Sequence, residues 1–303
     1  MEDISVIRPT ALRPGDRIGV IAPAGRVNES DLQPGLRMLE SSGFEVCLGA
    51  HLYDGQGYLA GDDEARLEDL HAMFLDREIK AIFCARGGYG SLRLLDRISY
   101  DLIRRNPKIF VGYSDIIALL VAIQERTGLV TFHGPMVREF GRADRENWES
   151  LNYLLSTGRP PRLSLNHGTA LVNGKATGPL LGGNLSLLCH LTGTPFFPSL
   201  EGCILFIEER GEAPYRLDRM LTHLALSGGL KGLAGLVAGE FEGCGEATIV
   251  NGLLTDIFSG SGIPVATGLP VGHGRKNIAL PLGLAAELDT GLMTLSIMEG
   301  CVV

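Results

Sequence analysis

Basic charge, long apolar runs and a leader-type N-terminus are all missing from this sequence, and each absence excludes a class of protein. The 27 lysines and arginines are outnumbered by 35 aspartates and glutamates, which gives a formal net charge of −8. Proteins that hold nucleic acid by its phosphate backbone carry basic surfaces, so we expect no nucleic-acid partner. No stretch is apolar over the roughly 20 residues that a membrane-spanning helix needs, so we expect no membrane partner.

Metal and cofactor motifs are absent as well. The six cysteines are scattered, and no two of them form a CxxC pair. The HExxH and HxH patterns of zinc sites do not occur, nor do Walker A or the G-x-G-x-x-G dinucleotide fingerprint. The sequence therefore predicts no metal site, no disulfide framework and no cofactor.

The N-terminal 25 residues show no basic start followed by an apolar core and a small-residue cleavage site. That arrangement marks a secretory signal peptide. Its absence predicts a cytoplasmic protein.

The first half of the chain alternates β-rich runs with helical patterns. Strands are predicted at 17–23, 44–49, 79–85, 108–113 and 130–135. Such alternation indicates an α/β domain with a parallel sheet and helices on both faces. Ligands of these sheets bind beyond the carboxyl ends of the strands, where four loop motifs fall: "APAG", "RGGYG", "YSD" and "HGP".

The second half has a different texture. Residues 158–168, "GRPPRLSLNHG", are rich in proline, glycine and polar side chains. We predict one domain at 1–157, a linker at 158–172 and a second domain at 173–303. Short β-type runs around two helices, at about 184–192 and 214–228, favour a mixed β/α second domain that is like a small barrel.

Ser114 lies between an apolar strand and an apolar helix, in "FVGYSD". A serine on such a turn can act as a nucleophile, because the following N–H groups stabilise a developing oxyanion. Serine is also a favoured helix N-cap, which requires no chemistry. The pattern differs from the G-x-S-x-G of α/β-hydrolases, and on its own it leaves both interpretations open.

Four further residues are candidates, each with a simpler interpretation beside it. Arg86 precedes the glycines of "RGGYG" and can clamp a carboxylate, or the loop can be purely structural. Asn184 in "GGN" can bind substrate or only cap a helix. Glu208 ends an apolar strand and can orient a histidine, although such acids are often solvated. His273 lies between two glycines and can face a cleft or solvent.

Seven segments resemble one family, and they occur in that family's order along most of the chain. The family is the serine LD-carboxypeptidases, the muramoyltetrapeptide carboxypeptidase group, which includes the microcin C immunity peptidases. The matching segments are "GDRIGVIAPAG", "IKAIFCARGGYGSLRLL", "KIFVGYSDIIALL", "TFHGPM", "GPLLGGNLSLL", "ILFIEERGEAPYRLDRML" and "GLPVGHGRKNIALPLG".

The resemblance implies a Rossmann-like N-terminal domain that carries the nucleophile and a mixed C-terminal domain that carries the acid and base. It implies a Ser114–Glu208–His273 triad. It also implies an oxyanion hole formed by the backbone amides of Asp115 and Gly88, and a homodimer. Glu209 follows Glu208 directly, so the choice between these two acids rests on motif position.

The function that this resemblance implies is hydrolysis of the bond to the terminal D-alanine of cytoplasmic murein tetrapeptides, in peptidoglycan recycling, through an acyl-enzyme. Arg86 and Asn184 are the candidates for holding the terminal carboxylate. One alternative is an immunity-type hydrolase of aminoacyl or peptidyl adenylate analogues. Such an enzyme needs an aromatic side chain that stacks on the nucleobase. The only tryptophan, Trp148, lies in a predicted helix before the linker, and no loop is rich in aromatic residues, which disfavours this alternative. A second alternative is a non-catalytic small-molecule binder, which the three filled triad positions disfavour.

Overall fold

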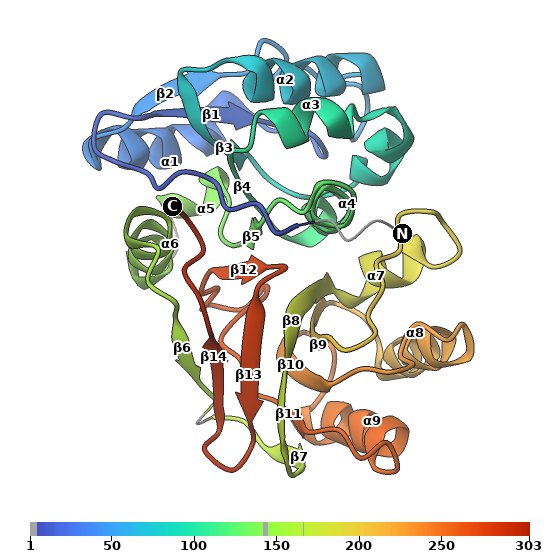
Figure 1. Cartoon of the computed structure of the whole chain (residues 1–303). Coiled ribbons are helices and arrows are strands. Elements are labelled where there is room, and N and C mark those ends of the chain that lie inside the picture. The colour runs from blue at the N-terminus through green and yellow to red at the C-terminus, as the bar shows by residue number, and fades with distance from the viewer. Residues whose placement is uncertain (1–4, 142–144, 166) are drawn as a thin grey trace. The chain divides into compact units, whose positions relative to one another are not determined.

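The computed structural model describes residues 5–141, 145–165 and 167–303, so residues 1–4 of the N-terminus and residue 166 of the predicted linker lie outside it. The chain divides into two compact units (Figure 1). Unit 1 contains Met1–Arg159, Ile278–Pro281 and Cys301–Val303, and unit 2 contains Pro160–Asn277 and Leu282–Gly300. Unit 1 is therefore built from three separate stretches of chain, whereas the predicted division was contiguous.

Unit 1 is organised around a six-stranded sheet in the order β12-β5-β4-β3-β1-β2. Pairs β1–β2, β1–β3, β3–β4 and β4–β5 are parallel. The strands are β1 (Arg17–Ile21), β2 (Glu45–Leu48), β3 (Ile79–Cys84), β4 (Ile109–Gly112), β5 (Thr131–His133) and β12 (Leu280–Leu282). The predicted parallel sheet is confirmed, and β12 joins it from a distant part of the chain.

Helices connect these strands as the sequence pattern predicts. The α-helices are α1 (Glu29–Ser41), α2 (Asp63–Leu75), α3 (Tyr100–Arg105), α4 (Ile117–Thr127), α5 (Val137–Phe140) and α6 (Arg145–Thr157), and the 3-10 turns are η1 (Ser91–Arg97) and η2 (Ser114–Ile116). Helix α2 begins after Asp62, whose carboxylate accepts a hydrogen bond from Ala65 N at 2.9 Å. Residues 117–123 of α4 are all buried, as expected for a helix that is apolar on every side.

The strand order of unit 1 changes direction at β1 and β3. The chain progresses outward from β1 to β2 on one side and through β3, β4 and β5 on the other. A crevice forms where such an order reverses, at the carboxyl ends of the strands, because the loops leave to opposite sides. Two of the predicted motifs, "APAG" after β1 and "RGGYG" after β3, follow the strands at this point.

Unit 2 contains eight strands in the order β6-β14-β13-β8-β9-β10-β11-β7. They are β6 (Arg162–Ser164), β7 (Ala170–Val172), β8 (Lys175–Asn184), β9 (Ile204–Arg210), β10 (Gly235–Glu242), β11 (Val265–Ala266), β13 (Ala285–Asp289) and β14 (Thr294–Ile297). Strand β8 joins two regions: its first half pairs antiparallel with β13, and its second half pairs parallel with β9.

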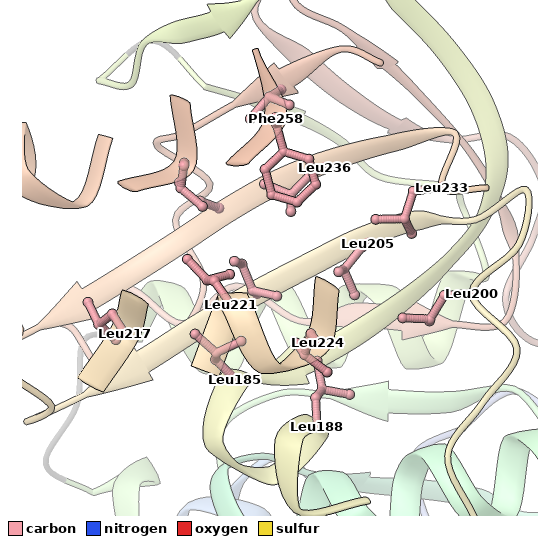
Figure 2. Close-up of a cluster of buried hydrophobic side chains, with 14 of the residues drawn as sticks. Leu185, Leu188, Leu200, Leu205, Leu217, Leu221, Leu224, Leu233, Leu236 and Phe258 are labelled. Atoms are coloured by element: carbon pink, nitrogen blue, oxygen red, sulfur yellow. The ribbon is translucent and has the colours of Figure 1, made fainter. Parts of the chain in front are cut away.

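Helices α7 (Leu185–Leu191), α8 (Pro214–Leu226) and α9 (Ala247–Phe258) complete unit 2. Figure 2 shows leucines of α7 and α8 meeting Leu205 of β9 and Leu236 of β10 in a buried cluster. Leu217, Leu221 and Leu224 recur at the spacing of one helix face, which is why α8 can cover the sheet.

Unit 2 differs from the prediction in three places. The mixed β/α character is confirmed, but the strand series has two edges, β6 and β7, where a closed barrel has none. The segment 158–172, predicted as a linker, contains these same two strands, because β14 and β11 offer them backbone partners. Helix α9 was not predicted.

Candidate active site

Ser114 occupies a strained turn at the carboxyl end of β4. Its φ is 61°, a left-handed value that it shares among the described non-glycine residues only with Met293. Such a conformation costs of order 1–3 kcal/mol for a residue with a Cβ and is found at functional sites. The residue before the η2 turn is Tyr113, so Ser114 is not its N-cap. The structural interpretation of Ser114 as a helix cap is therefore wrong.

The glycines of the "RGGYG" loop pass directly beside this hydroxyl. A Cβ placed on Gly87 would lie 3.0 Å from Ser114 Oγ and 3.4 Å from Asp115 N. Gly25 N donates to Gly87 O at 3.2 Å, which ties the loop after β1 to the loop after β3. The backbone of this loop thus passes beside Ser114 and Asp115 N. Gly88 has a φ of 119°, which glycine adopts without strain.

Two buried polar side chains fix this loop, those of Asp115 and Arg66; the sequence predicted a role only for the backbone amide of Asp115 and none for Arg66. The Asp115 carboxylate accepts from Ser91 N at 2.9 Å; burial raises the pKa of Asp115, and the hydrogen bonds from Ser91 oppose that shift. Arg66, which is 1% exposed, donates to Pro23 O at 2.7 Å and to Gly90 O at 3.0 Å. Arg66 also pairs with Asp63. Its position on an amphipathic helix resembles that of any surface arginine, so no local pattern reveals it.

Arg86 lies on the same loop and lines a cavity of about 350 Å³ with Gly25, Tyr58, Gly88 and Tyr89. Its guanidinium donates to Gly87 O at 3.2 Å and to Arg26 O at 3.1 Å. Burial, and then the charge of Arg138, lower the pKa of Arg86. Two of the five N–H donors of a guanidinium are used in these bonds, which leaves donors for a ligand.

Changing Gly87 to alanine is expected to lower kcat by about 10- to 100-fold. The added methyl would force Ser114 to move, and a displacement of about 1 Å at a reacting group can cost 100-fold. Steady-state kinetics with the tetrapeptide substrate that the sequence resemblance implies measure the effect. Gly252→Ala is the control, since a Cβ there meets nothing within 4 Å and alanine favours helix α9. Equal kcat for Gly87→Ala and wild type would contradict the close approach.

Unit 2 brings the predicted acid and base together. Glu208, near the end of β9, is fully buried, and its Oε2 lies 2.6 Å from His273 Nδ1. Burial raises the pKa of Glu208, while the hydrogen bond from His273 opposes that shift. An ionised Glu208 accepts from Nδ1, an arrangement in which Nε2 is the ring nitrogen that can act as a base. Ser114 belongs to unit 1 and is not part of this pair.

Glycines allow the histidine loop to approach the acid. A Cβ on Gly272, whose φ is 134°, would lie 3.1 Å from Glu208 Oε2 and 3.2 Å from Glu240 Cβ. A Cβ on Gly274 would lie 3.1 Å from Glu240 Cγ. Gly272 N donates to Asn277 Oδ1 at 3.2 Å, which closes the loop on itself. The "GHG" pattern therefore has a steric reason on both sides of His273.

Glu209 has different hydrogen-bond partners from Glu208. Adjacent residues of a strand point to opposite faces, and the Glu209 carboxylate turns to the start of α7. It accepts from Asn184 Nδ2, from N and Oγ of Ser186, and from Arg210 N, at 2.7–3.0 Å. Asn184 is the N-cap of α7, as predicted, and accepts from Leu187 N. Geometry thus separates the two acids that motif position alone had to separate.

Within the described ranges, no group of three His, Cys, Asp or Glu side chains could hold a metal ion. No helix there is long and apolar enough to cross a membrane.

Comparison with known proteins identifies the family. Residues 18–134 match the LD-carboxypeptidase N-terminal domain, and residues 177–288 match the LD-carboxypeptidase C-terminal domain. The chain belongs to the LD-carboxypeptidase family. The resemblance that the seven sequence segments predict is confirmed.

Individual relatives match this LD-carboxypeptidase over nearly its full length. The probable murein peptide carboxypeptidase of Bacillus subtilis (strain 168) is 42% identical over 302 residues, 97% of this chain and 95% of the relative. The crystal structure of the muramoyltetrapeptide carboxypeptidase from Oxalobacter formigenes superposes with a TM-score of 0.84 at 32% identity, covering 94% of this chain and 99% of that one. The MccF-like protein from Bacillus anthracis str. Ames gives 0.91 at 29% identity, covering 97% and 100%. The predicted α/β fold class is confirmed.

Proposed function

We propose that this family member is a serine LD-carboxypeptidase that releases the terminal D-alanine of murein tetrapeptides. The observation that carries the proposal is the 2.6 Å contact between Glu208 and His273 on glycine-shaped backbone. An imidazole held in one tautomer by a buried carboxylate is the base that serine hydrolysis requires. The names of the relatives from Bacillus subtilis and Oxalobacter formigenes support murein peptides as the substrate class.

The mechanism proceeds through an acyl-enzyme and requires the two units to bring Ser114 to His273. His273 Nε2 takes the Ser114 proton as Oγ attacks the carbonyl carbon of the scissile bond. The N–H groups of Asp115 and Gly88 hold the oxyanion, each donor being worth about 3–4 kcal/mol in comparable sites. His273 then protonates the leaving nitrogen of D-alanine. Water, deprotonated by the same imidazole, hydrolyses the ester and restores Ser114.

Arg86 is the better of the two candidates for the substrate's terminal carboxylate. Its guanidinium keeps unused donors and borders the cavity beside Gly88. The Asn184 amide is already engaged at both ends, with Glu209 and with Leu187 N. Asn184 is therefore the weaker candidate for this role.

Peptidoglycan recycling, a cytoplasmic location and a homodimer stay predictions that the family resemblance suggests. Cell fractionation tests the location, and light scattering after gel filtration tests the dimer.

One observation favours a second candidate, hydrolysis of aminoacyl adenylate analogues. Tyr58 and Tyr89 are exposed and in edge-to-face contact, with ring centroids 5.6 Å apart, on the wall of the Arg86 cavity. Exposed rings of this kind can stack on a nucleobase. Trp148 does not offer such a surface, since it is buried. The MccF-like structural neighbour gives this candidate further support.

A comparison of three substrates tests the proposal. A murein tetrapeptide ending in D-alanine, the same peptide ending in L-alanine, and an aminoacyl sulfamoyl adenosine are each incubated with the protein. We expect free D-alanine from the first peptide, at least about 100-fold faster than free L-alanine from the second. Cleavage of the adenosine compound alone would overturn the proposal in favour of the second candidate.

A further inference from the structure

Arg66 of helix α2 is a fully buried cation to which the mechanism assigns no step. Its Nη1 donates to Pro23 O at 2.7 Å and to Gly90 O at 3.0 Å. Its Nε donates to Asp62 O at 3.3 Å, and its Nη2 pairs with Asp63. Burial lowers the pKa of Arg66, and the charge of Asp63 opposes that shift. Replacing such a buried charge with apolar side chains is often neutral or stabilising, so stability alone does not explain Arg66.

The two carbonyls on Arg66 Nη1 belong to different loops. Pro23 lies in the loop after β1, and Gly90 ends the "RGGYG" loop after β3. One nitrogen therefore ties together the two loops that leave the sheet where its strand order reverses. The approach is close, because a Cβ on Gly90 would lie 2.6 Å from Arg66 Nη1. A larger residue at this position would displace the guanidinium.

The segment between the tied carbonyls contains one of the two proposed oxyanion donors, the Gly88 amide. Gly87 is held through its carbonyl by the loop after β1, and Gly90 is held through its carbonyl by Arg66. Gly88 and Gly90 have φ values of 119° and 133°. Glycine has no side chain to restrict its backbone, so it adopts many conformations with similar ease. The direction of the Gly88 N–H is therefore set by the ties on either side of it.

Arg66 is itself held in one orientation. Its partner Asp63 also accepts two hydrogen bonds from Arg93, from Nε to Oδ1 and from Nη2 to Oδ2, each at 2.8 Å. Arg93 lies in η1, directly after the "RGGYG" loop. Planar guanidinium groups bind a carboxylate in a fixed geometry. The loop, Arg93, Asp63 and Arg66 thus form a closed ring of contacts within unit 1.

We propose that Arg66 is a positioning residue, which holds the Gly88 amide where the oxyanion forms during attack by Ser114. The inference rests on the proposed function, because the oxyanion belongs to that reaction. A donor that is fixed in advance stabilises the transition state without reorganisation, and a displacement of about 1 Å can cost 100-fold in rate. A fully buried side chain does not contact the substrate, so Arg66 should act on kcat and leave KM nearly unchanged.

Arg66→Ala with added guanidinium tests the proposal. We expect kcat for D-alanine release to fall about 10- to 100-fold and KM to stay within about threefold of wild type. Guanidinium chloride at millimolar concentration should raise kcat of this variant by about tenfold, and sodium chloride at the same concentration should not. Neither salt should raise kcat of wild type. Arg66→Lys should lose about tenfold in kcat, because an ammonium does not reproduce the planar fork.

Phe74→Leu is the control for a general loss of stability. Phe74 is buried in the same helix, and its ring centroid lies 5.9 Å from that of Phe110. The variant should be less stable than wild type and keep kcat within about twofold. An equal loss of kcat in Phe74→Leu and Arg66→Ala would overturn the inference.

Hydrogen exchange of residues 87–91 separates this inference from the proposed function. The backbone amides there should exchange at least about tenfold faster in Arg66→Ala than in wild type, and guanidinium should slow them again. If no peptide is cleaved, the proposed function fails, and the exchange rates still decide whether Arg66 holds the loop. Where Arg66→Ala does not fold, Arg66→Lys decides by the same two measurements. Exchange or kcat equal to wild type in the folded variant would overturn the inference.

Discussion

Replacing Ser114 by alanine should reduce D-alanine release by roughly 10⁴- to 10⁶-fold, the loss that follows removal of a serine nucleophile. The fold should persist, because the hydroxyl caps no helix and the turn is held by other contacts. Those contacts are the Asp115 carboxylate on Ser91 N and the close approach of Ile116 to Gly112. Release of D-alanine is followed by an enzyme-coupled assay, and folding by circular dichroism. Undiminished release from Ser114→Ala would reject the nucleophile.

Glycine at the same position separates chemistry from strain. Ser114→Gly should be as inactive as Ser114→Ala but more stable by about 1 kcal/mol, because glycine adopts a φ of 61° without penalty. Met293→Gly is the matched control: Met293 has a φ of 50° in the turn before β14, outside the loop that carries His273. Met293→Gly should also be more stable than wild type, and it should keep full activity. Chemical denaturation measures the unfolding free energy of both variants, and the D-alanine assay measures their activity.

The sequence predicted well those parts of the molecule that local patterns determine. The apolar strands of the first half and the amphipathic helix α8 have the right type and nearly the right bounds. The pairing of Glu208 with His273 was also predicted, but through the ordered motifs of a family. Neither spacing nor periodicity relates positions 65 residues apart.

Non-local contacts account for what was not predicted. Strand β12 is three residues long, and only the neighbouring β5 makes it a strand. Helix α9, "ATIVNGLLTDIF", mixes β-branched residues and a glycine, and it is helical because Val250, Leu254 and Phe258 pack into the core of unit 2. The segment "SLRLLDR" forms a 3-10 turn, where the Asp115 carboxylate accepts from its first N–H.

The same substitution should affect catalysis at Glu208 and folding stability at Glu209. Glu208→Gln should lower kcat by roughly 10³- to 10⁴-fold, since an amide neither holds His273 in its working tautomer nor stabilises the imidazolium. Glu209→Gln should keep kcat within about tenfold of wild type, because no bond joins Glu209 to the histidine. Its effect should be on folding. Four donors that converge on a buried carboxylate would face an amide N–H₂ instead, a loss of about 2–4 kcal/mol in unfolding free energy.

The pH dependence of folding stability tests independently how burial affects the protonation of Glu208. Because burial raises its pKa, the folded protein keeps a proton that the unfolded chain has already lost, over the interval between the ordinary glutamate value and the raised one. Wild-type stability contains a contribution from Glu208 that is present below this interval and lost as the pH rises through it. Glutamine does not titrate, so Glu208→Gln should equal or exceed wild type in unfolding free energy at neutral pH. As the solution is made more acidic, the unfolding free energy of wild type should rise relative to that of Glu208→Gln.

Denaturant titrations of both proteins across acid and neutral pH measure this difference in unfolding free energy. A wild-type advantage that grows with rising pH would mean that His273 outweighs burial at this carboxyl, and that the pair is held as an ion pair in the resting protein.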